Sequence, residues 1–389
     1  MEKDRVISDK RILAGNIAVM AALFIMTFGC WNEYSWYEKI APLGTLICCL
    51  LLGITFLCYA DIKKCIRDLE FYLMLAGDAV ALVHLLVIKS NKGAFLTVAL
   101  LLLVLYLSDK LVIPVKLMYG AGIYLGFFFY YWTFDVKGYF KGYNTNYGGL
   151  VLITGFVFAV LMLRILCAGL RNAEKKKLYI AVMLFTIFMF AWGYNIIAWY
   201  RARCALVGLL VFGVLLLIPR KVWGNKILFG IIIAGSTFGA IAVSGLYILL
   251  GKMKEVFTIQ IFYKDILSGR DEIWTELWTE FLHKPITGIG SSYVMKLSWM
   301  DGMLEVHNGL LDILIVHGIT VFIIVCYFLI KRLWALRENV ATDEISRTAF
   351  CGITAMLISS FLENFFIVPP FTICFLILLV WARKSSIRA

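Results

Sequence analysis

Residues 227–250 read ILFGIIIAGSTFGAIAVSGLYILL and contain no charged side chain. A helix needs about 20 mostly apolar residues to cross the hydrocarbon core of a bilayer. This stretch is therefore long enough to span a membrane, and it predicts a transmembrane helix.

The composition of the whole chain agrees with this stretch. Of the 389 residues, 62% are hydrophobic and only 16% are charged, and the mean hydropathy is +0.88. A soluble domain is about 45–50% apolar and about 25% charged, so a soluble globular enzyme is excluded. A disordered chain is also excluded, because it would be charge-rich and poor in aromatic residues. Most of the ten Cys lie in apolar runs without a C-x-x-C pair, and we interpret them as packing residues.

Eleven further apolar runs accompany residues 227–250, and together they predict an all-α, polytopic transmembrane bundle of about 12 spans. The fourth, eighth and twelfth runs are short for a span. In chain order the runs cover about 12–30, 41–60, 71–88, 94–108, 111–134, 147–168, 179–199, 204–218, 227–250, 309–330, 348–366 and 369–382.

Lys and Arg residues indicate which side of the membrane each loop faces. With a cytoplasmic N-terminus, 22 of the 37 Lys and Arg fall on inner segments and seven on short outer loops. Short cytoplasmic loops are enriched in basic residues, so both termini are predicted to be cytoplasmic. Nearly all of the net charge of +12 is then an orientation signal, and we expect no nucleic-acid partner.

Residues 251–307 form a 57-residue stretch between the ninth and tenth predicted spans, on the outer side. In the sequence, this is the one place with room for a folded extramembrane unit. We therefore divide the chain into helices 1–9 (1–250), an external loop with catalytic-site elements (251–307) and helices 10–12 (308–389).

One amphipathic helix is expected within this loop. Ser268 and Asp271 have the spacing of a capping box, and Pro285 ends the helix before a turn at 288–290. Arg270, in the first turn, opposes the helix dipole, which points to a compensating partner such as an anionic ligand. The apolar stripe favours a position on the lipid interface or against the bundle, and it consists of Ile273, Trp274, Leu277, Trp278 and Phe281.

The order of motifs around this helix resembles the O-antigen ligase and polysaccharide polymerase superfamily. The family's Arg at an outer helix end matches Arg203 in residues 201–206, although Ala202 replaces the usual Ser. The resemblance is sharpest over residues 268–320, and it implies about a dozen spans with one large external loop. Its motifs are Ser268-Gly269-Arg270, Ile273-Trp274, Pro285-Ile286-Thr287-Gly288-Ile289-Gly290, His307-Asn308 and His317-Gly318-Ile319.

The resemblance implies a glycosyltransferase of a bacterial-type cytoplasmic (inner) membrane, with its active site on the outer face. Its partners would be a polyprenyl-diphosphate-linked oligosaccharide, of the undecaprenyl diphosphate kind, an acceptor glycan and the lipid bilayer. We favour a polymerase of surface polysaccharide in cell-envelope biosynthesis. An O-antigen ligase that uses a different acceptor is the close alternative, and the motifs do not separate the two. No cofactor is implied.

The donor's diphosphate needs cations at the membrane surface. A guanidinium group binds phosphate oxygens bidentately, and Arg203, Arg201 and Arg270 are the candidates on the predicted outer side. The sequence contains no D-x-D pair, the motif with which many glycosyltransferases hold a divalent metal. The absence of this motif favours neutralisation of the diphosphate charge by arginine side chains and not by a metal ion.

The acceptor hydroxyl needs a base, and a neutral His suits that role near neutral pH. His307 is the candidate by family position, and Arg270 completes the predicted catalytic pair. His283 is the second choice as base. Polar residues near His307 in the sequence are candidates to orient its ring or to bind the acceptor. Two other His lie within predicted spans and are interpreted as structural. The first group comprises Asn308, Glu305, Asp312 and Asp301, and the second comprises His84 and His317.

Acidic residues within predicted spans leave a second class open. Asp78, Asp312 and Glu363 are costly in lipid and are typical of a transport pathway. A transporter or flippase for lipid-linked sugars is therefore the alternative to an enzyme. The aromatic run 127–132, at the outer end of the fifth span, is interpreted as an interfacial belt or as a contact for sugar or the isoprenoid chain.

Overall fold

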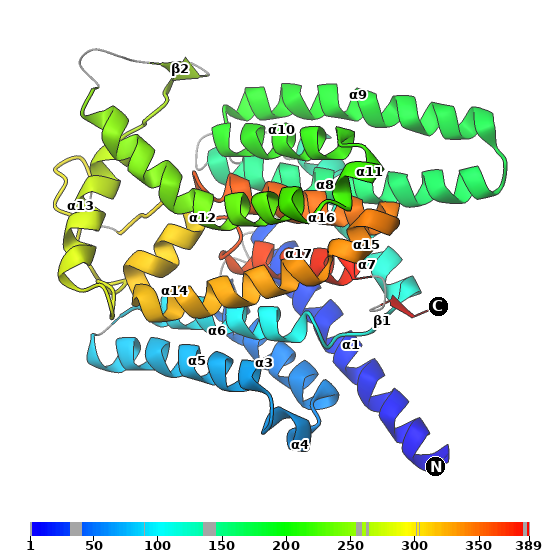
Figure 1. Cartoon of the computed structure of the whole chain (residues 1–389), viewed down its shortest axis with the longest axis horizontal. Coiled ribbons are helices and arrows are strands. Elements are labelled where there is room, and N and C mark those ends of the chain that lie inside the picture. The colour runs from blue at the N-terminus through cyan, green and yellow to red at the C-terminus, as the bar shows by residue number, and fades with distance from the viewer. Residues whose placement is uncertain are drawn as a thin grey trace. The chain divides into compact units, whose positions relative to one another are not determined.

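The structure is a computed structural model that describes residues 2–31, 41–88, 90–134, 145–253, 259–261, 264–300, 302, 304–383 and 387–388. Its described part is dominated by helices, in agreement with the all-α prediction (Figure 1). The chain forms two compact units, each assembled from segments far apart in sequence. Unit 1 comprises Met1–Val112, Thr237–Arg332 and Ser360–Leu376, and unit 2 comprises Ile113–Ser236, Leu333–Ser359 and Ile377–Ala389.

The N-terminal helices of unit 1 are packed in sequence-adjacent pairs. The helices α1 and α3 contact each other, and α5 lies beside α6 (Figure 1). Asp68 caps α5 by accepting from Glu70 N, and Asn91 caps α6 by accepting from Gly93 N, as expected for such residues at N-caps. The bounds are α1 Glu2–Trp31, α3 Ala41–Tyr59, α4 Ile62–Cys65, α5 Leu69–Val87 and α6 Lys92–Leu107.

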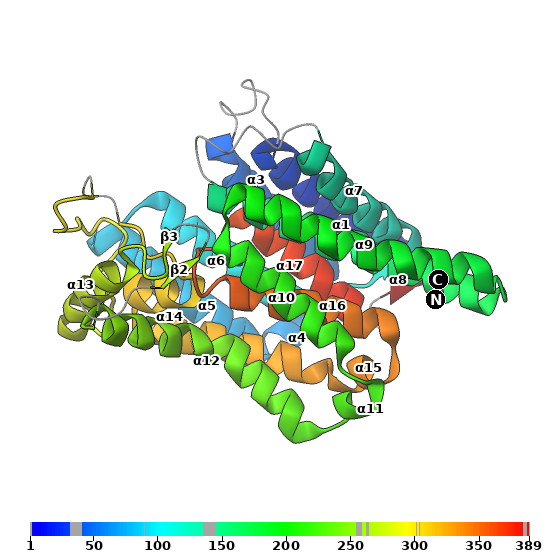
Figure 2. The ribbon, with the colours of Figure 1, turned by 90° about the horizontal axis from the view of Figure 1, so that it is seen from above.

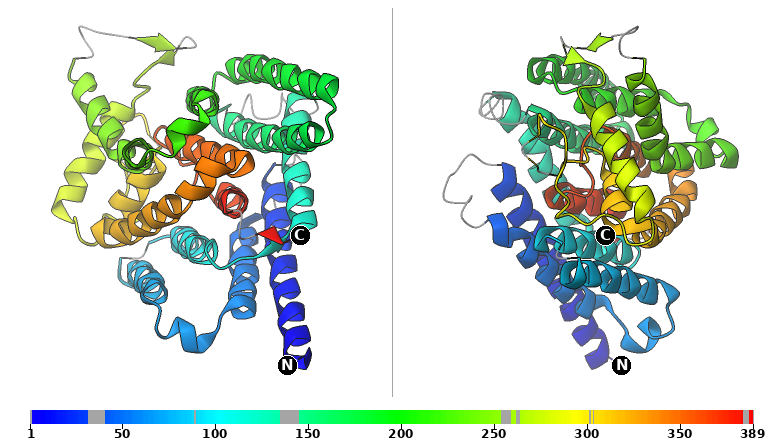
Figure 3. Two further views of the ribbon diagram at one scale, coloured as in Figure 1. Left: turned by 45° about the vertical axis from the view of Figure 1, so that its right-hand side comes forward. Right: turned by 90° about the vertical axis from the view of Figure 1, so that its left-hand side faces the viewer.

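The later segments of unit 1 surround the start of α14, the helix after the predicted external loop. The helix α13 lies beside the first residues of α14, as two views agree (Figure 3). Two helices of this region, α12 and α17, lie in unit 1 over part of their length. The bounds are α12 Lys226–Gly251, β2 Gln260–Ile261, β3 Lys264–Asp265, α13 Arg270–His283, α14 Gly309–Ala335 and α17 Pro369–Ala382, and β2 pairs antiparallel with β3.

Unit 2 is built around α8, which contacts α7, α9, α10 and α16. The helices α8 and α9 run side by side (Figure 2). Glycine permits the close approach of α7 and α8, since a Cβ at Gly155 would lie 2.6 Å from Phe129 N. The bounds are β1 Ile113–Pro114, α7 Val115–Phe134, α8 Thr145–Asn172, α9 Lys176–Tyr200, α10 Arg203–Leu217, α11 Arg220–Trp223, α15 Arg337–Thr342, α16 Glu344–Ser359 and β4 Ile387–Arg388; β1 pairs in parallel with β4.

Each of the twelve apolar runs contains a helix, and six described helices are long and apolar enough to cross a membrane. They lie at Asp9–Trp31, Leu69–Val87, Thr145–Asn172, Lys176–Tyr200, Lys226–Gly251 and Gly309–Thr342. The chain is thus a multi-pass membrane protein, while the number of twelve spans and the division into 1–250, 251–307 and 308–389 remain predictions. All ten Cys are described and are free thiols.

A buried ion pair joins α14 to α5 within unit 1. The Arg332 guanidinium bonds both carboxylate oxygens of Glu70, and its Nε donates to Leu105 O at 2.9 Å. Both charged side chains are 6% exposed. Lys331 adds a second cation 2.6 Å from Glu70, so the carboxylate at the start of α5 is fully compensated.

Candidate functional site

The helix α13 begins at Arg270, where the sequence predicts it, but by a different cap. The N-cap is Gly269, with φ 77°, and it makes no side-chain cap hydrogen bond. The Ser268 hydroxyl instead donates to Asp265 O at 2.9 Å. Ser268 itself has φ 50°, so the chain enters the helix through two left-handed residues, and the N-cap position falls on Gly269 rather than on Ser268 of the predicted capping box.

Arg270 is only 7% exposed and is held by the segment between α16 and α17. Its NH2 donates to Leu362 O at 2.7 Å and lies 3.4 Å from Glu363 Oε2. The sequence indicated that this cation needs a compensating partner, and within the chain Glu363 provides one.

His307 lies between two carboxylates, just before α14. Its Nδ1 is 2.8 Å from Glu363 Oε1, and its Nε2 is 2.8 Å from Glu305 Oε2. The backbone at His307 is left-handed, with φ 52°. Such a conformation is uncommon outside glycine and is concentrated at functional sites.

The two carboxylates decide the charge of this imidazole. Burial by itself disfavours the imidazolium, but hydrogen bonds to Glu305 and Glu363 outweigh it and raise the pKa of His307 to about 9. The hydrogen bond to His307 correspondingly holds the pKa of Glu305 below its usual value. At neutral pH the group is thus an imidazolium between two carboxylates, with the Arg270 guanidinium on the far side of Glu363.

The segment that carries Glu363 is fastened to the segment that carries His307. Gly309 N donates to Ser360 O at 2.9 Å, and Asn308 N donates to Asn364 Oδ1 at 2.8 Å. The Ser360 hydroxyl donates to Glu363 O at 3.2 Å. These bonds fix the position of Glu363, whose side chain is 14% exposed.

Asn308 and Asp312 have supporting positions beside this group. Asn308 is fully buried, and its side chain donates to Ala240 O of α12 at 3.0 Å and accepts from Leu311 N at 3.1 Å. Asp312 accepts from Asn364 Nδ2 at 3.3 Å. Both residues therefore belong to the frame around His307.

A mostly apolar cavity of about 190 Å³ lies next to Asp312 in unit 1. His317 and Asn364 also line it, together with apolar residues of α6 and of residues 367–369. His317 stacks on His84 of α5, with ring centroids 6.0 Å apart. Both rings are buried, at 3% and 2% exposure, and the structural role of these two His stays a prediction.

Two of the motifs meet at a break in α14. Gly318 has φ 81° and ψ 174°, and the helix is interrupted there. Residues 285–290 fill the interruption, because Ile289 N and Gly290 N donate to Ile315 O and Val316 O while Ile319 N donates to Pro285 O, at 2.9, 3.1 and 2.9 Å. A Cβ on Gly318 would overlap the Ile286 carbonyl oxygen. The glycines thus permit a backbone contact that the sequence predicted only as a turn.

Arg201 and Arg203 lie in unit 2, at the junction of α9 and α10. Arg201 is the exposed C-cap of α9, with φ 56°, and Arg203 is the first residue of α10. Ala202, where the family usually has Ser, is 0% exposed and lies against Gly149 of α8. A methyl group therefore fits this contact, and the two arginines flank it.

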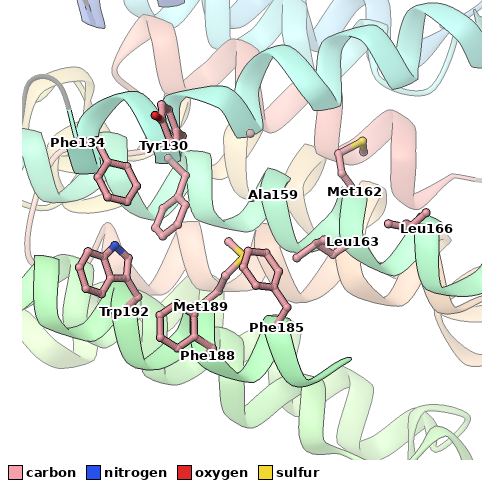
Figure 4. Close-up of a pocket in the computed structure, with 12 residues that line it drawn as sticks. Tyr130, Phe134, Ala159, Met162, Leu163, Leu166, Phe185, Phe188, Met189 and Trp192 are labelled. Carbon is pink, nitrogen blue, oxygen red and sulfur yellow. The ribbon is translucent and has the colours of Figure 1, made fainter. Parts of the chain in front are cut away.

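An apolar groove of about 500 Å³ runs along α9 in unit 2. Helices α7, α8 and α9 line it, and aromatic rings from α7 and α9 face one another across it (Figure 4). Phe134 stacks on Trp192 at 6.0 Å, and Trp192 on Phe188 at 6.3 Å. Part of the aromatic run 127–132 therefore lines the groove, through Phe129 and Tyr130.

Glu363 was missed as a site residue in the sequence, where it appears only as an acid within an apolar run. It lies 56 residues from His307, and no local spacing connects them. Of the other candidates, His283 is exposed at the end of α13, and Asp301 lies outside the described residues. Within the part of the chain that the structure covers, no group of three His, Cys, Asp or Glu is arranged to hold a metal.

The fold and this site describe a multi-pass membrane protein with a charged cluster at the start of an apolar helix. Residues 181–326 match the family model of the O-antigen ligase (Wzy_C). This match over part of the chain supports the resemblance to the O-antigen ligase-like superfamily that the motifs indicated, a family of glycosyl-transfer enzymes. The matched stretch includes Arg201, Arg203, Arg270 and His307, whereas Glu363 lies beyond it. Comparisons with curated proteins and with solved structures found no match.

Proposed function

We propose that this protein transfers a saccharide from a polyprenyl diphosphate carrier to an acceptor glycan hydroxyl, as a polymerase of surface-polysaccharide repeats. The observation that carries this proposal is His307, which is held by Glu305 and Glu363 beside Arg270 within a stretch that matches the O-antigen ligase family. A His in that position accepts the proton of the acceptor hydroxyl once its Nε2 is free.

The groove of unit 2 supports a donor with an isoprenoid chain. Its lining is apolar and aromatic, and Phe188 is 58% exposed, so the groove is open at the surface. Trp192 precedes Arg201 by nine residues on the same helix, or about 13 Å along its axis. A lipid chain in the groove therefore places its diphosphate toward the α9–α10 junction, where Arg201 and Arg203 supply positive charge.

The first experiment uses the purified full-length protein in vesicles with a lipid-linked donor and an acceptor glycan. We expect His307→Ala and Arg270→Ala to abolish glycan transfer, and Arg201→Ala or Arg203→Ala to raise the KM for the donor. A ladder of products indicates a polymerase, and a single transfer indicates a ligase. Full transfer by correctly folded His307→Ala protein would refute the proposed site.

The groove has its own test. Ala159→Trp adds bulk to the groove wall, so it should raise the KM for a long-chain donor and leave that for a short-chain donor nearly unchanged. Leu184→Trp is the control for an added Trp in unit 2, because Leu184 lies on the adjacent helix α9, is 61% exposed and does not line the groove. An equal effect of Ala159→Trp on both donors would contradict isoprenoid binding there.

The same vesicles distinguish the second class of function. Movement of the lipid-linked glycan across the bilayer without new glycosidic bonds would identify a transporter or flippase and contradict the enzyme proposal. The broken helix α14 and the half-buried Asp312 are features that transporters also have, and they are the reason for this measurement.

A further inference from the structure

The contacts of His307 define its resting protonation state. An ionised carboxylate only accepts hydrogen bonds, and both ring nitrogens of His307 lie 2.8 Å from a carboxylate oxygen. Both nitrogens must then carry a proton, so neither has a free lone pair. A base in this state first has to lose a proton before it can accept one from the acceptor hydroxyl.

The two carboxylates beside the ring are not equivalent. Glu363 is 14% exposed, bonds Arg270, and belongs to the segment fastened at Ser360 and Asn364. The Glu305 side chain is 48% exposed and lies in the segment before α14, where no helix constrains it. The contacts of Glu363 thus hold its side chain in place, whereas the Glu305 side chain can turn to water without breaking the hydrogen bonds that hold residues 307–309.

We propose that Glu305 is a proton shuttle that carries the Nε2 proton of His307 to water, and that Glu363 is a positioning residue that holds Nδ1. This inference rests on the proposed glycosyl transfer. Two carboxylates at the same distance from one ring thus have different roles: Glu305 moves a proton and Glu363 positions the ring.

The Nε2 proton passes to Glu305, which turns outward and releases it to water, leaving His307 neutral with a lone pair on Nε2. The acceptor hydroxyl gives its proton to Nε2 as its oxygen bonds to the sugar's anomeric carbon. The bond from that carbon to the diphosphate oxygen breaks, and its electron pair leaves with the diphosphate. His307 is again an imidazolium, and Glu305 removes the next proton.

The charges around His307 make the loss of its Nε2 proton the least favourable step of the cycle. Glu305 and Glu363 stabilise the imidazolium, while Arg270 opposes it from beyond Glu363. The pKa of His307 is raised and that of Glu305 is lowered, so proton transfer from the ring to Glu305 is uphill. The rate of turnover should therefore respond directly to the loss of the shuttle.

Three variants separate these roles. Glu305→Gln should lower kcat by about a hundredfold, and imidazole buffer should restore most of it, because a small base replaces the shuttle. Glu363→Gln should lower kcat without rescue, since a buffer does not reposition the ring. Glu280→Gln is the control: Glu280 is a surface carboxylate paired with Lys296, and its loss should leave kcat unchanged.

A second readout is independent of activity. The chain has four His, so NMR of His-labelled protein resolves His307 by comparison with a His307→Asn sample. In the wild type the His307 ring should remain an imidazolium up to about pH 9, and in Glu305→Gln its titration should move to lower pH.

Failure of the shuttle and failure of the proposed function look different. If wild-type protein transfers glycan while Glu305→Gln matches its kcat, or loses activity that no small buffer restores, the shuttle is refuted and the transfer function stands. If wild-type protein transfers no glycan, the proposed function fails. An unchanged His307 titration in Glu305→Gln would overturn the inference in either case.

Discussion

Gly318→Ala tests the contact between the break in α14 and residues 285–290. Gly318 has φ 81° and ψ 174°, a region that is essentially restricted to glycine and costs other residues about 1–3 kcal/mol. The added methyl group would also overlap the Ile286 carbonyl oxygen, a backbone atom that cannot turn away. The three backbone hydrogen bonds across this contact contribute about 0.5–1.5 kcal/mol each. We therefore expect a destabilisation of about 2.5–7.5 kcal/mol if all three are lost.

The assay is thermal unfolding in detergent, followed with a thiol-reactive dye, because Cys48 and Cys326 are buried free thiols in unit 1. Gly53→Ala, in α3, is the matched control: a Cβ there meets nothing within 4 Å, and alanine favours a helix by about 1 kcal/mol over glycine. Gly318→Ala should melt well below wild type and lose glycan transfer, while Gly53→Ala should do neither. If Gly318→Ala has the same melting temperature as Gly53→Ala and keeps full activity, the contact with residues 285–290 does not stabilise the helix break.

Two further predictions concern charge. Arg332→Ala leaves the buried Glu70 carboxylate without its principal partner, so it should lower the free energy of unfolding by about 3–5 kcal/mol. The double variant Arg332→Met with Glu70→Leu should recover most of that loss. If Arg332→Ala alone is as stable as wild type, the ion pair does not have this role. Because the folded-state pKa of His307 is raised from 6.5 to about 9, its stabilising contribution is complete below about pH 6.5 and is lost as pH rises through about 9. The melting difference between wild type and Glu305→Gln should therefore shrink between pH 6 and pH 10, and a constant difference would show that Glu305 does not act through the charge of His307.

The sequence supports the helical parts of this structure best. Apolar runs of about 20 residues report lipid burial directly, and a helix was found in each. The motif order also led to Arg270 and His307, which the structure brings to opposite sides of one carboxylate.

The partner contacts were less accessible from the sequence. Helical periodicity shows which face of α14 is apolar, but not that the 360–365 segment returns to residues 307–309. Glu363 therefore appeared as an isolated acid and Arg270 as a cation awaiting an anion. The break at Gly318 was missed for a similar reason, since one glycine in an apolar run is common and its conformation depends on residues 285–290.

The fastening of residues 307–309 by residues 360–365 has a consequence for biosynthesis. Residues 285–290 are made before Gly318, so the partner for the helix break is already present when α14 is completed. Glu363, the second carboxylate partner of His307, is made more than fifty residues later, in the segment between α16 and α17. A nascent chain therefore makes the helices up to α16 while His307 still lacks Glu363, and the proposed site is assembled only after residues 360–365 have been made.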